Sequence, residues 1–184
     1  GALAEWPPRA GNGRGSTTPL TDRTGIVVDD SACDPSDLAQ CGAITVAVGA
    51  EEDWGQLVQR AMASGWPGLE FLDRVPGTVA DAVRSTPQIG GQSVGAAVAS
   101  VRTWDRKTDS QRSFPRSDCH FEPGVSRFQE LLSDGRERYD LLQVTFLFKQ
   151  GDYTARIQDP ELAASLDVAE GDRIRLTEYA ARRG

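Results

Sequence analysis

The sequence is poor in the residues that bind metals. It has one histidine, His120, and three cysteines, Cys33, Cys41 and Cys119. An odd number of widely spaced cysteines is not a disulfide framework, although Cys33 and Cys41 could pair across a loop. No CxxC or HxxxH pair is present, and the adjacent Cys119 and His120 would point to opposite faces of a strand. We therefore predict no metal site.

Long apolar runs and an excess of positive charge are also missing. No run approaches the ~20 apolar residues that span a bilayer, and the first residues do not form a signal peptide. The net charge is -7, the pI is about 4.8, and no basic stripe is present. This charge disfavours nucleic acids and anionic membrane surfaces as partners. We expect a cytoplasmic protein that acts on a small molecule.

What is present suits one globular domain. The chain has 184 residues, of which 39% are hydrophobic, and its mean hydropathy is -0.42. These values are typical of a soluble protein with its own core. Lysine occurs only at 107 and 149, whereas arginine, alanine, glycine and valine are abundant. That choice of residues is typical of a high-GC genome, such as that of an actinobacterium.

The hydrophobic pattern predicts an α+β fold with mostly antiparallel strands. Residues 1–25 are rich in Gly, Pro, Thr and Arg and form an N-terminal arm, whereas 26–184 form a single domain. A helix begins at Asp53, which forms a capping box with Gln56, and ends at Gly65. Further helices are expected at 127–132 and 160–166, strands at 26–28, 43–48, 94–104, 111–114 and 139–148, and a strand followed by a helix at 172–180. Residues 65–95 are expected to be a long irregular loop that lines a binding site.

Several motifs in the right order carry a resemblance to a known family. Residues 65–72 read Gly-Trp-Pro-Gly-Leu-Glu-Phe-Leu, and residues 75–79 read Val-Pro-Gly-Thr-Val. The strand at 100–106 also matches, and the whole stretch 65–106 aligns with the family pattern without gaps. Together with residues 118–121 and 126–128, this pattern resembles UDP-N-acetylenolpyruvoylglucosamine reductase, known as MurB. The resemblance implies an FAD-binding-like α+β domain of the vanillyl-alcohol-oxidase type over about residues 26–180. The family's C-terminal substrate lobe and the first half of its nucleotide lobe have no match.

Departures from the family pattern fall where the flavin is held. Ser85 and Thr86 stand at the family's Gln-Asn, Gln88 at a glycine and Gly90 at a tyrosine. Asp81 replaces an alanine, and a backbone that approaches a flat ring closely needs small residues. The resemblance therefore implies a degenerate domain that binds no FAD and does not carry out the parent reaction.

The remaining pattern favours an enzyme that works without a cofactor. A cyclase or cycloaddition catalyst of actinobacterial secondary metabolism needs mainly a groove that orients a small, largely apolar substrate, with a few donors to a carbonyl. Ser126 aligns with the serine of the family's Tyr-Arg-x-Ser segment, although its neighbours are changed to Pro123, Gly124 and Gln129. The candidate catalytic residues are Ser126, Gln92 and Gln88, and the candidate substrate-binding residues are Trp66, Arg84, Ser85, Thr86, Ser93 and Phe128.

Two other functions stay open at this point. The chain could be a non-catalytic binding or assembly module, for example a homodimer that covers a former domain interface. It could also be a residual FAD-dependent oxidoreductase. Each candidate residue has a structural alternative as a loop or packing residue, and Glu70 is expected to support the Gly-Leu-Glu turn rather than to form an acid-base pair with Glu122.

Overall fold

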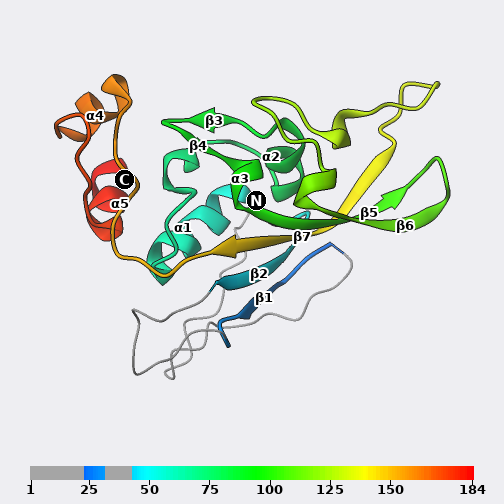
Figure 1. Cartoon of the computed structure of the whole chain (residues 1–184), viewed down its shortest axis with the longest axis horizontal. Helices are drawn as coiled ribbons and strands as arrows, with labels where there is room; N and C mark the ends of the chain where they lie inside the picture. The colour runs from blue at the N-terminus through cyan, green and yellow to red at the C-terminus, as the bar shows by residue number, and fades with distance from the viewer. Residues whose placement is uncertain (1–22, 32–42) are drawn as a thin grey trace.

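A five-stranded antiparallel sheet forms the centre of the molecule (Figure 1). The computed structural model describes residues 23–31 and 43–184. The strand order is β1-β2-β7-β5-β6, and all neighbours are antiparallel. The strands are β1 (Ile26–Asp29), β2 (Ile44–Gly49), β5 (Val98–Asp105), β6 (Ser110–Pro115) and β7 (Tyr139–Phe148). The α+β fold with a mostly antiparallel sheet is confirmed, and the predicted arm, which includes residues 1–22, lies largely outside the described residues.

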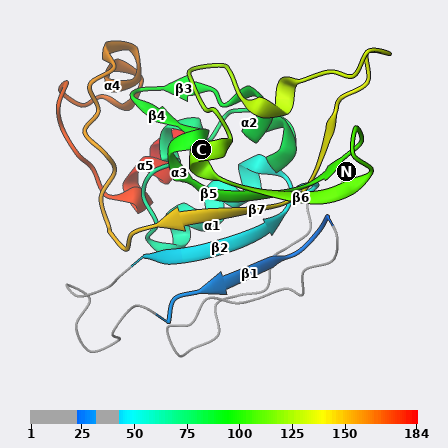
Figure 2. The ribbon, with the colours of Figure 1, turned by 45° about the vertical axis from the view of Figure 1, so that its right-hand side comes forward.

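One face of the sheet carries the core. In β7, Val144 and Phe146 are fully buried, whereas Leu147 is 48% exposed, as the predicted alternation requires. Val46 and Val48 of β2 lie opposite Phe146 and Val144 in the register of the two strands. The helices α1 (Trp54–Ser64), α2 (Val79–Ser85) and α3 (Val94–Ala97) lie on this side of the sheet, whereas β1 lies at its edge (Figure 2).

The helix α1 (Trp54–Ser64) confirms the strongest prediction from the sequence. The Asp53 carboxylate accepts a hydrogen bond from the Gln56 amide at 2.9 Å. Gly65 ends the helix in the left-handed conformation, with a φ of 75°. Trp54 is fully buried, and its indole Nε1 donates to the backbone oxygen of Leu72 at 2.9 Å. The helix therefore anchors the loop that follows it.

The segment 65–95 contains short helices and strands, which corrects the prediction that it is a long irregular loop. It contains a 3₁₀ turn at Glu70–Leu72, α2 (Val79–Ser85), the two-stranded hairpin of β3 (Gln88–Ile89) and β4 (Gln92–Ser93), and α3 (Val94–Ala97). A capping box fixes the start of α2, because Thr78 and Asp81 each accept the other's backbone amide. Asp81 thus has a structural use in this chain. Residues 94–97 form a short helix, and β5 starts four residues later than predicted.

The C-terminal part consists of α4 (Pro160–Leu166) and α5 (Leu176–Arg183), joined to the body through Arg183, which pairs with Asp73 at 2.9 Å. The helix predicted at 160–166 is confirmed. The helix predicted at 127–132 is only a 3₁₀ turn at Arg127–Gln129. A further 3₁₀ turn lies at Arg116–Asp118. No helix of the described residues is long and apolar enough to cross a membrane.

Candidate functional site

Three of the predicted site residues line one cavity. Thr86, Gln88 and Ser93 surround a volume of about 310 Å³. We call this cavity the Thr86 cavity. Its other side comes from α3 and from residues 116–123: Gly95, Ala96, Arg116, Phe121, Glu122 and Pro123. The chain thus brings residues 86–96 against residues 116–123.

The wall formed by residues 86–96 is held by side chains bonded to backbone. Thr86 ends α2 in the left-handed region, with a φ of 36°, and its Oγ1 accepts a hydrogen bond from the Gly95 amide at 3.1 Å. Ser93 caps α3 by accepting from the Ala96 amide at 3.3 Å. A Cβ at Gly95 would come within 2.6 Å of Phe121, so only glycine lets this ring lie against α3. Thr86 and Ser93 therefore shape the cavity.

Only a few side chains of the Thr86 cavity are available to contact a ligand, and they differ in chemical character. The Gln88 side chain is exposed on β3 and forms no hydrogen bond within residues 23–31 and 43–184. Arg116 donates through Nη1 to the backbone oxygen of Ala96 at 3.1 Å, which places its guanidinium beside α3. Phe121 supplies an aromatic surface, and Glu122 supplies a carboxylate. The cavity can thus hold a small molecule with an apolar body and a polar group.

The side chains of Ser126 and Gln92, two predicted catalytic residues, form hydrogen bonds to backbone groups of the chain. The Ser126 hydroxyl donates to the backbone oxygen of Arg84 at 2.7 Å, and only 5% of the residue is exposed. The Gln92 Oε1 accepts from the Phe71 amide at 2.9 Å, and its Nε2 is buried without a partner in the described part of the chain. Neither side chain lines the Thr86 cavity.

The other predicted binding residues also lie outside the Thr86 cavity. Arg84 pairs with Glu137 at 3.0 Å and donates to the backbone oxygen of Tyr139 at 2.9 Å. Ser85 bonds back to the Asp81 oxygen of its own helix. Trp66 and Phe128 are core residues: Trp66 stacks on Phe148 with 5.6 Å between ring centroids, and Phe128 packs edge-on against Phe114 and Tyr139.

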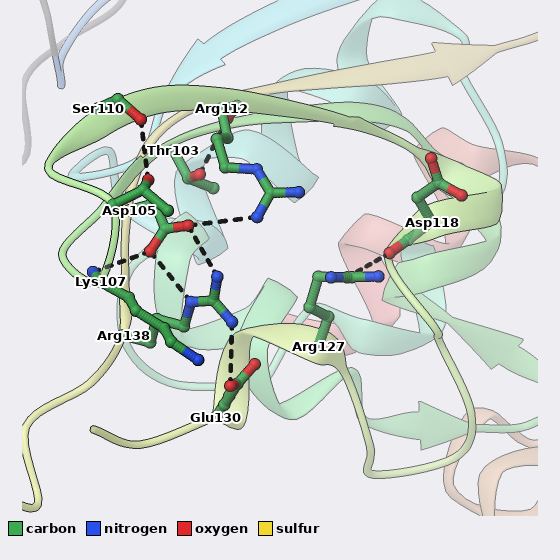
Figure 3. A network of polar contacts seen from close by, with 10 residues as sticks. Thr103, Asp105, Lys107, Ser110, Arg112, Asp118, Arg127, Glu130 and Arg138 are labelled. Carbon is green, nitrogen blue, oxygen red and sulfur yellow. Dashed lines mark hydrogen bonds and ion pairs between the residues drawn. The ribbon is translucent and has the colours of Figure 1, made fainter. Parts of the chain in front are cut away.

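Asp105 is a buried, ion-paired carboxylate that the sequence did not indicate. Figure 3 shows it between two guanidinium groups. Arg138 donates to both carboxylate oxygens at 3.0 Å, and Arg112 approaches Oδ2 at 3.2 Å. The hydrogen bonds from Arg138 lower the pKa of Asp105 well below its usual range, and Asp105 in turn raises the pKa of Arg138. This cluster fastens β7 to the β5-β6 hairpin.

The Cys119 thiol is unsuited to nucleophilic chemistry. It is fully buried, and this burial raises its pKa to about 12. The neighbouring His120 is exposed, and its Nε2 lies 3.2 Å from the Arg127 guanidinium. Among the described residues, no three His, Cys, Asp or Glu side chains gather in a way that could hold a metal ion. Cys33 and Cys41, whose pairing was left open, lie outside the described residues.

A flavin diphosphate would need unoccupied donors, and the starts of α2 and α3 offer few. Anions bind at helix starts through free backbone amides. At the start of α2, the amides of residues 78–81 already donate within the chain, to Asp81 Oδ2, Glu52 O, Ala50 O and Thr78 Oγ1. At the start of α3, the amides of Gly95 and Ala96 are taken by Thr86 and Ser93. The described residues therefore do not fit the diphosphate of FAD at these two helix starts.

The comparisons with known proteins place this α+β domain in a class. No family model matches the sequence. It is 35% identical over 139 residues to the UDP-N-acetylenolpyruvoylglucosamine reductase of Cutibacterium acnes, covering 76% of this chain and 36% of the relative. For the reductase of Salinispora arenicola the identity is 32% over 138 residues, covering 75% of this chain and 37% of the relative. The chain thus belongs to the class of domains related to UDP-N-acetylenolpyruvoylglucosamine reductase.

Solved structures include similar chains as well. The reductase MurB of Thermus caldophilus matches with a TM-score of 0.48 and 23% identity, over 57% of this chain and 36% of that one. A solvent-stable cholesterol oxidase matches with a TM-score of 0.44 and 15% identity, over 80% of this chain and 30% of that one. On the sequence identities above, the chain is a MurB-like homologue, and its match spans slightly more than a third of the length of each of the two relatives named above.

Proposed function

We propose that this MurB-like domain binds a small, largely apolar molecule in the Thr86 cavity and acts on it without a flavin, as a cyclase or cycloaddition catalyst. The observation that carries the proposal is the position of Thr86 and Gln88. Both stand where the family pattern has flavin-site residues, and both line a cavity in this chain. The amides that could have held a diphosphate nearby are used by the chain itself.

The chemistry of the cavity suits catalysis by orientation. Its volume of about 310 Å³ is at the lower end of the roughly 300–1,000 Å³ that ligand pockets occupy. Holding a reactive conformer of an apolar substrate against Phe121 lowers the entropy cost of ring closure. The Gln88 amide can donate to a substrate carbonyl, and Arg116 adds a positive charge to the lining of the same cavity. In this proposal Gln88 is the main polar contact to the substrate.

The first test is a comparison of two Gln→Ala variants. A panel of polyene substrates with a reactive carbonyl is incubated with the wild type, with Gln88→Ala and with the control Gln158→Ala, whose residue is also exposed but lies outside the cavity. We expect Gln88→Ala to slow cyclisation about 10²-fold or more, in the range of a lost carbonyl donor, and Gln158→Ala to leave the rate unchanged. Equal rates for all three proteins would refute the assignment of the site.

The same preparation separates this proposal from a flavin-dependent oxidoreductase. A protein that binds FAD shows the flavin absorption bands and a higher unfolding temperature when FAD is added. We expect neither effect. Bound flavin, reduced by a nicotinamide donor, would replace the proposal with a redox function.

A further inference from the structure

A second cavity lies at the carboxyl end of β7. Its volume is about 540 Å³, larger than that of the Thr86 cavity, with which it shares Ala96. It is bounded by Pro67 and Gly68 after α1, by the end of β7, by residues 151–155 and by Arg173. It is called here the Leu147 cavity. No residue predicted from the sequence as a site residue lines it.

The walls of the Leu147 cavity expose large apolar side chains. Leu147 is 48% exposed and Tyr153 is 47% exposed, although most large hydrophobic side chains of the described residues are buried. Behind them Phe148 is only 2% exposed, and it stacks on Trp66. An apolar surface that is concave and solvent-exposed is a typical binding surface for a flat organic molecule.

The charged groups of this cavity favour an anion. Lys149 and Arg173 line it together with one acidic residue, Asp152. Within the described part of the chain neither Lys149 nor Arg173 forms an ion pair, and both are exposed. On a chain with a net charge of -7, this is a local excess of positive charge. Two exposed cations beside an apolar wall match an amphipathic anion.

The frame of the cavity is fixed by buried hydrogen bonds. The Glu70 carboxylate, which is 1% exposed, accepts from the Gly68 amide at 2.7 Å and from the Ala155 amide at 2.9 Å. It thereby joins two segments of the chain that both line the cavity. The Leu176 amide donates to the Asp152 oxygen at 2.8 Å, which holds the loop to α5. A preformed frame reduces the entropy lost when a ligand binds.

We propose that the Leu147 cavity binds a small organic anion with a flat apolar body, of the class of aromatic carboxylates. The ring packs against Leu147 and Tyr153, and the carboxylate interacts with Lys149 and Arg173. This site does not depend on the proposed reaction in the Thr86 cavity. The anion site requires Lys149 and Arg173, whereas the proposed reaction requires Gln88, so variants of these residues distinguish the two proposals.

The test uses 2-naphthoate, with 2-naphthamide as a neutral molecule of the same shape. Binding to the whole chain is measured by titration calorimetry at low and at high salt. We expect the carboxylate to bind at least tenfold more tightly than the amide and to lose affinity as salt is added, because salt screens the two exposed cations. Equal binding of both molecules would overturn the proposal.

The second arm of the test uses charge variants. The double variant Lys149→Ala, Arg173→Ala is compared with Lys107→Ala, Arg136→Ala, which loses the same charge on exposed residues outside the cavity. We expect the first to weaken binding of 2-naphthoate at least tenfold and the second by less than twofold. If the first variant were misfolded by circular dichroism, the salt dependence of the wild type would decide.

The experiment would also show whether the Leu147 cavity is covered by a second copy of the chain. If the cavity were instead an interface between two copies, sedimentation would show a dimer, Leu147→Ser would convert it to a monomer, and 2-naphthoate would bind no more tightly than 2-naphthamide. That outcome would contradict the anion site. We expect Leu147→Ser to weaken binding of both molecules and to leave the oligomeric state unchanged.

Discussion

Replacing the buried carboxylate of Asp105 tests whether its cluster holds the β5-β6 hairpin to β7. In Asp105→Asn the side chain keeps its shape and loses its charge, so Arg138 faces an amide in place of a carboxylate. The Arg138 side chain is only 13% exposed, but it keeps Glu130 at 3.0 Å as a partner. Arg112 is 41% exposed and is expected to contribute little.

The expected loss of unfolding free energy in Asp105→Asn follows from these contacts. Breaking a buried ion pair by removing one partner costs about 3–5 kcal/mol. Since Glu130 still neutralises Arg138, we expect the lower end, about 3 kcal/mol, which for a chain of this size corresponds to a fall of roughly 6–12 °C in Tm. The control is Asp134→Asn, because Asp134 and its partner Arg136 are both largely exposed. We expect this control to change the free energy of unfolding by less than about 1 kcal/mol.

The stability that Asp105 contributes is expected to change with pH in one direction. The pKa of Asp105 is lowered from its ordinary value of 3.8 in the folded protein, so the unfolded chain takes up a proton first as the pH falls. The contribution of Asp105 to stability is therefore fully present well above pH 3.8, and it is lost as the pH falls below that value toward the pKa of the folded state. We expect urea unfolding, followed by circular dichroism, to show a constant difference between wild type and Asp105→Asn from about pH 5 to pH 7 and a smaller one at pH 3. A loss no greater than that of Asp134→Asn would refute the role given to the cluster.

Three further predictions concern packing and reactivity. Gly95→Ala places a Cβ within 2.6 Å of Phe121, and we expect it to lower stability by about 1–3 kcal/mol and to alter the Thr86 cavity, as read from urea unfolding and ligand binding. Trp66→Ala removes the ring stacked on Phe148, and we expect a loss of about 3–5 kcal/mol in the same unfolding assay. Cys119, whose pKa is raised to about 12 by burial, is expected to resist iodoacetamide at pH 8 in the native protein and to react after unfolding, as peptide mass spectrometry would show. Rapid native labelling of Cys119 would contradict its burial.

The elements that the sequence predicted correctly are those with strong local signals. Asp53 and Gly65 mark the two ends of α1, and the alternating apolar residues of β7 mark a buried strand. The segment 65–95 was expected to be irregular because its elements are only two to seven residues long. The box that starts α2 has Asp81 at its third position, in place of the usual Glu or Gln, and so gave a weaker signal.

The candidate site was predictable only in part. Thr86, Gln88 and Ser93 are close in sequence, so their common location could be predicted from the family motif. The opposite wall, around Phe121, comes from a loop whose position depends on long-range packing. Ser126 and Gln92 were plausible donors by residue type, but their bonding partners, Arg84 and Phe71, lie 42 and 21 residues away along the chain.

Neither the Asp105 cluster nor the Leu147 cavity could be predicted from the sequence, and the reason is the same for both. Asp105 and Arg138 are 33 residues apart, and Glu70 and Ala155 are 85 residues apart. No local pattern of charge or hydropathy joins such residues, because it is the antiparallel pairing of β5 with β7 and the return of the chain after β7 that bring them together. Features of this kind follow from topology.

The most direct test of the central claim is an absorbance spectrum of the purified chain, taken before and after equilibration with FAD and removal of the unbound cofactor. We expect no bound flavin and no change in unfolding temperature, because the amides at the starts of α2 and α3 already have partners within the chain. A stoichiometric flavin spectrum with a raised unfolding temperature would contradict it.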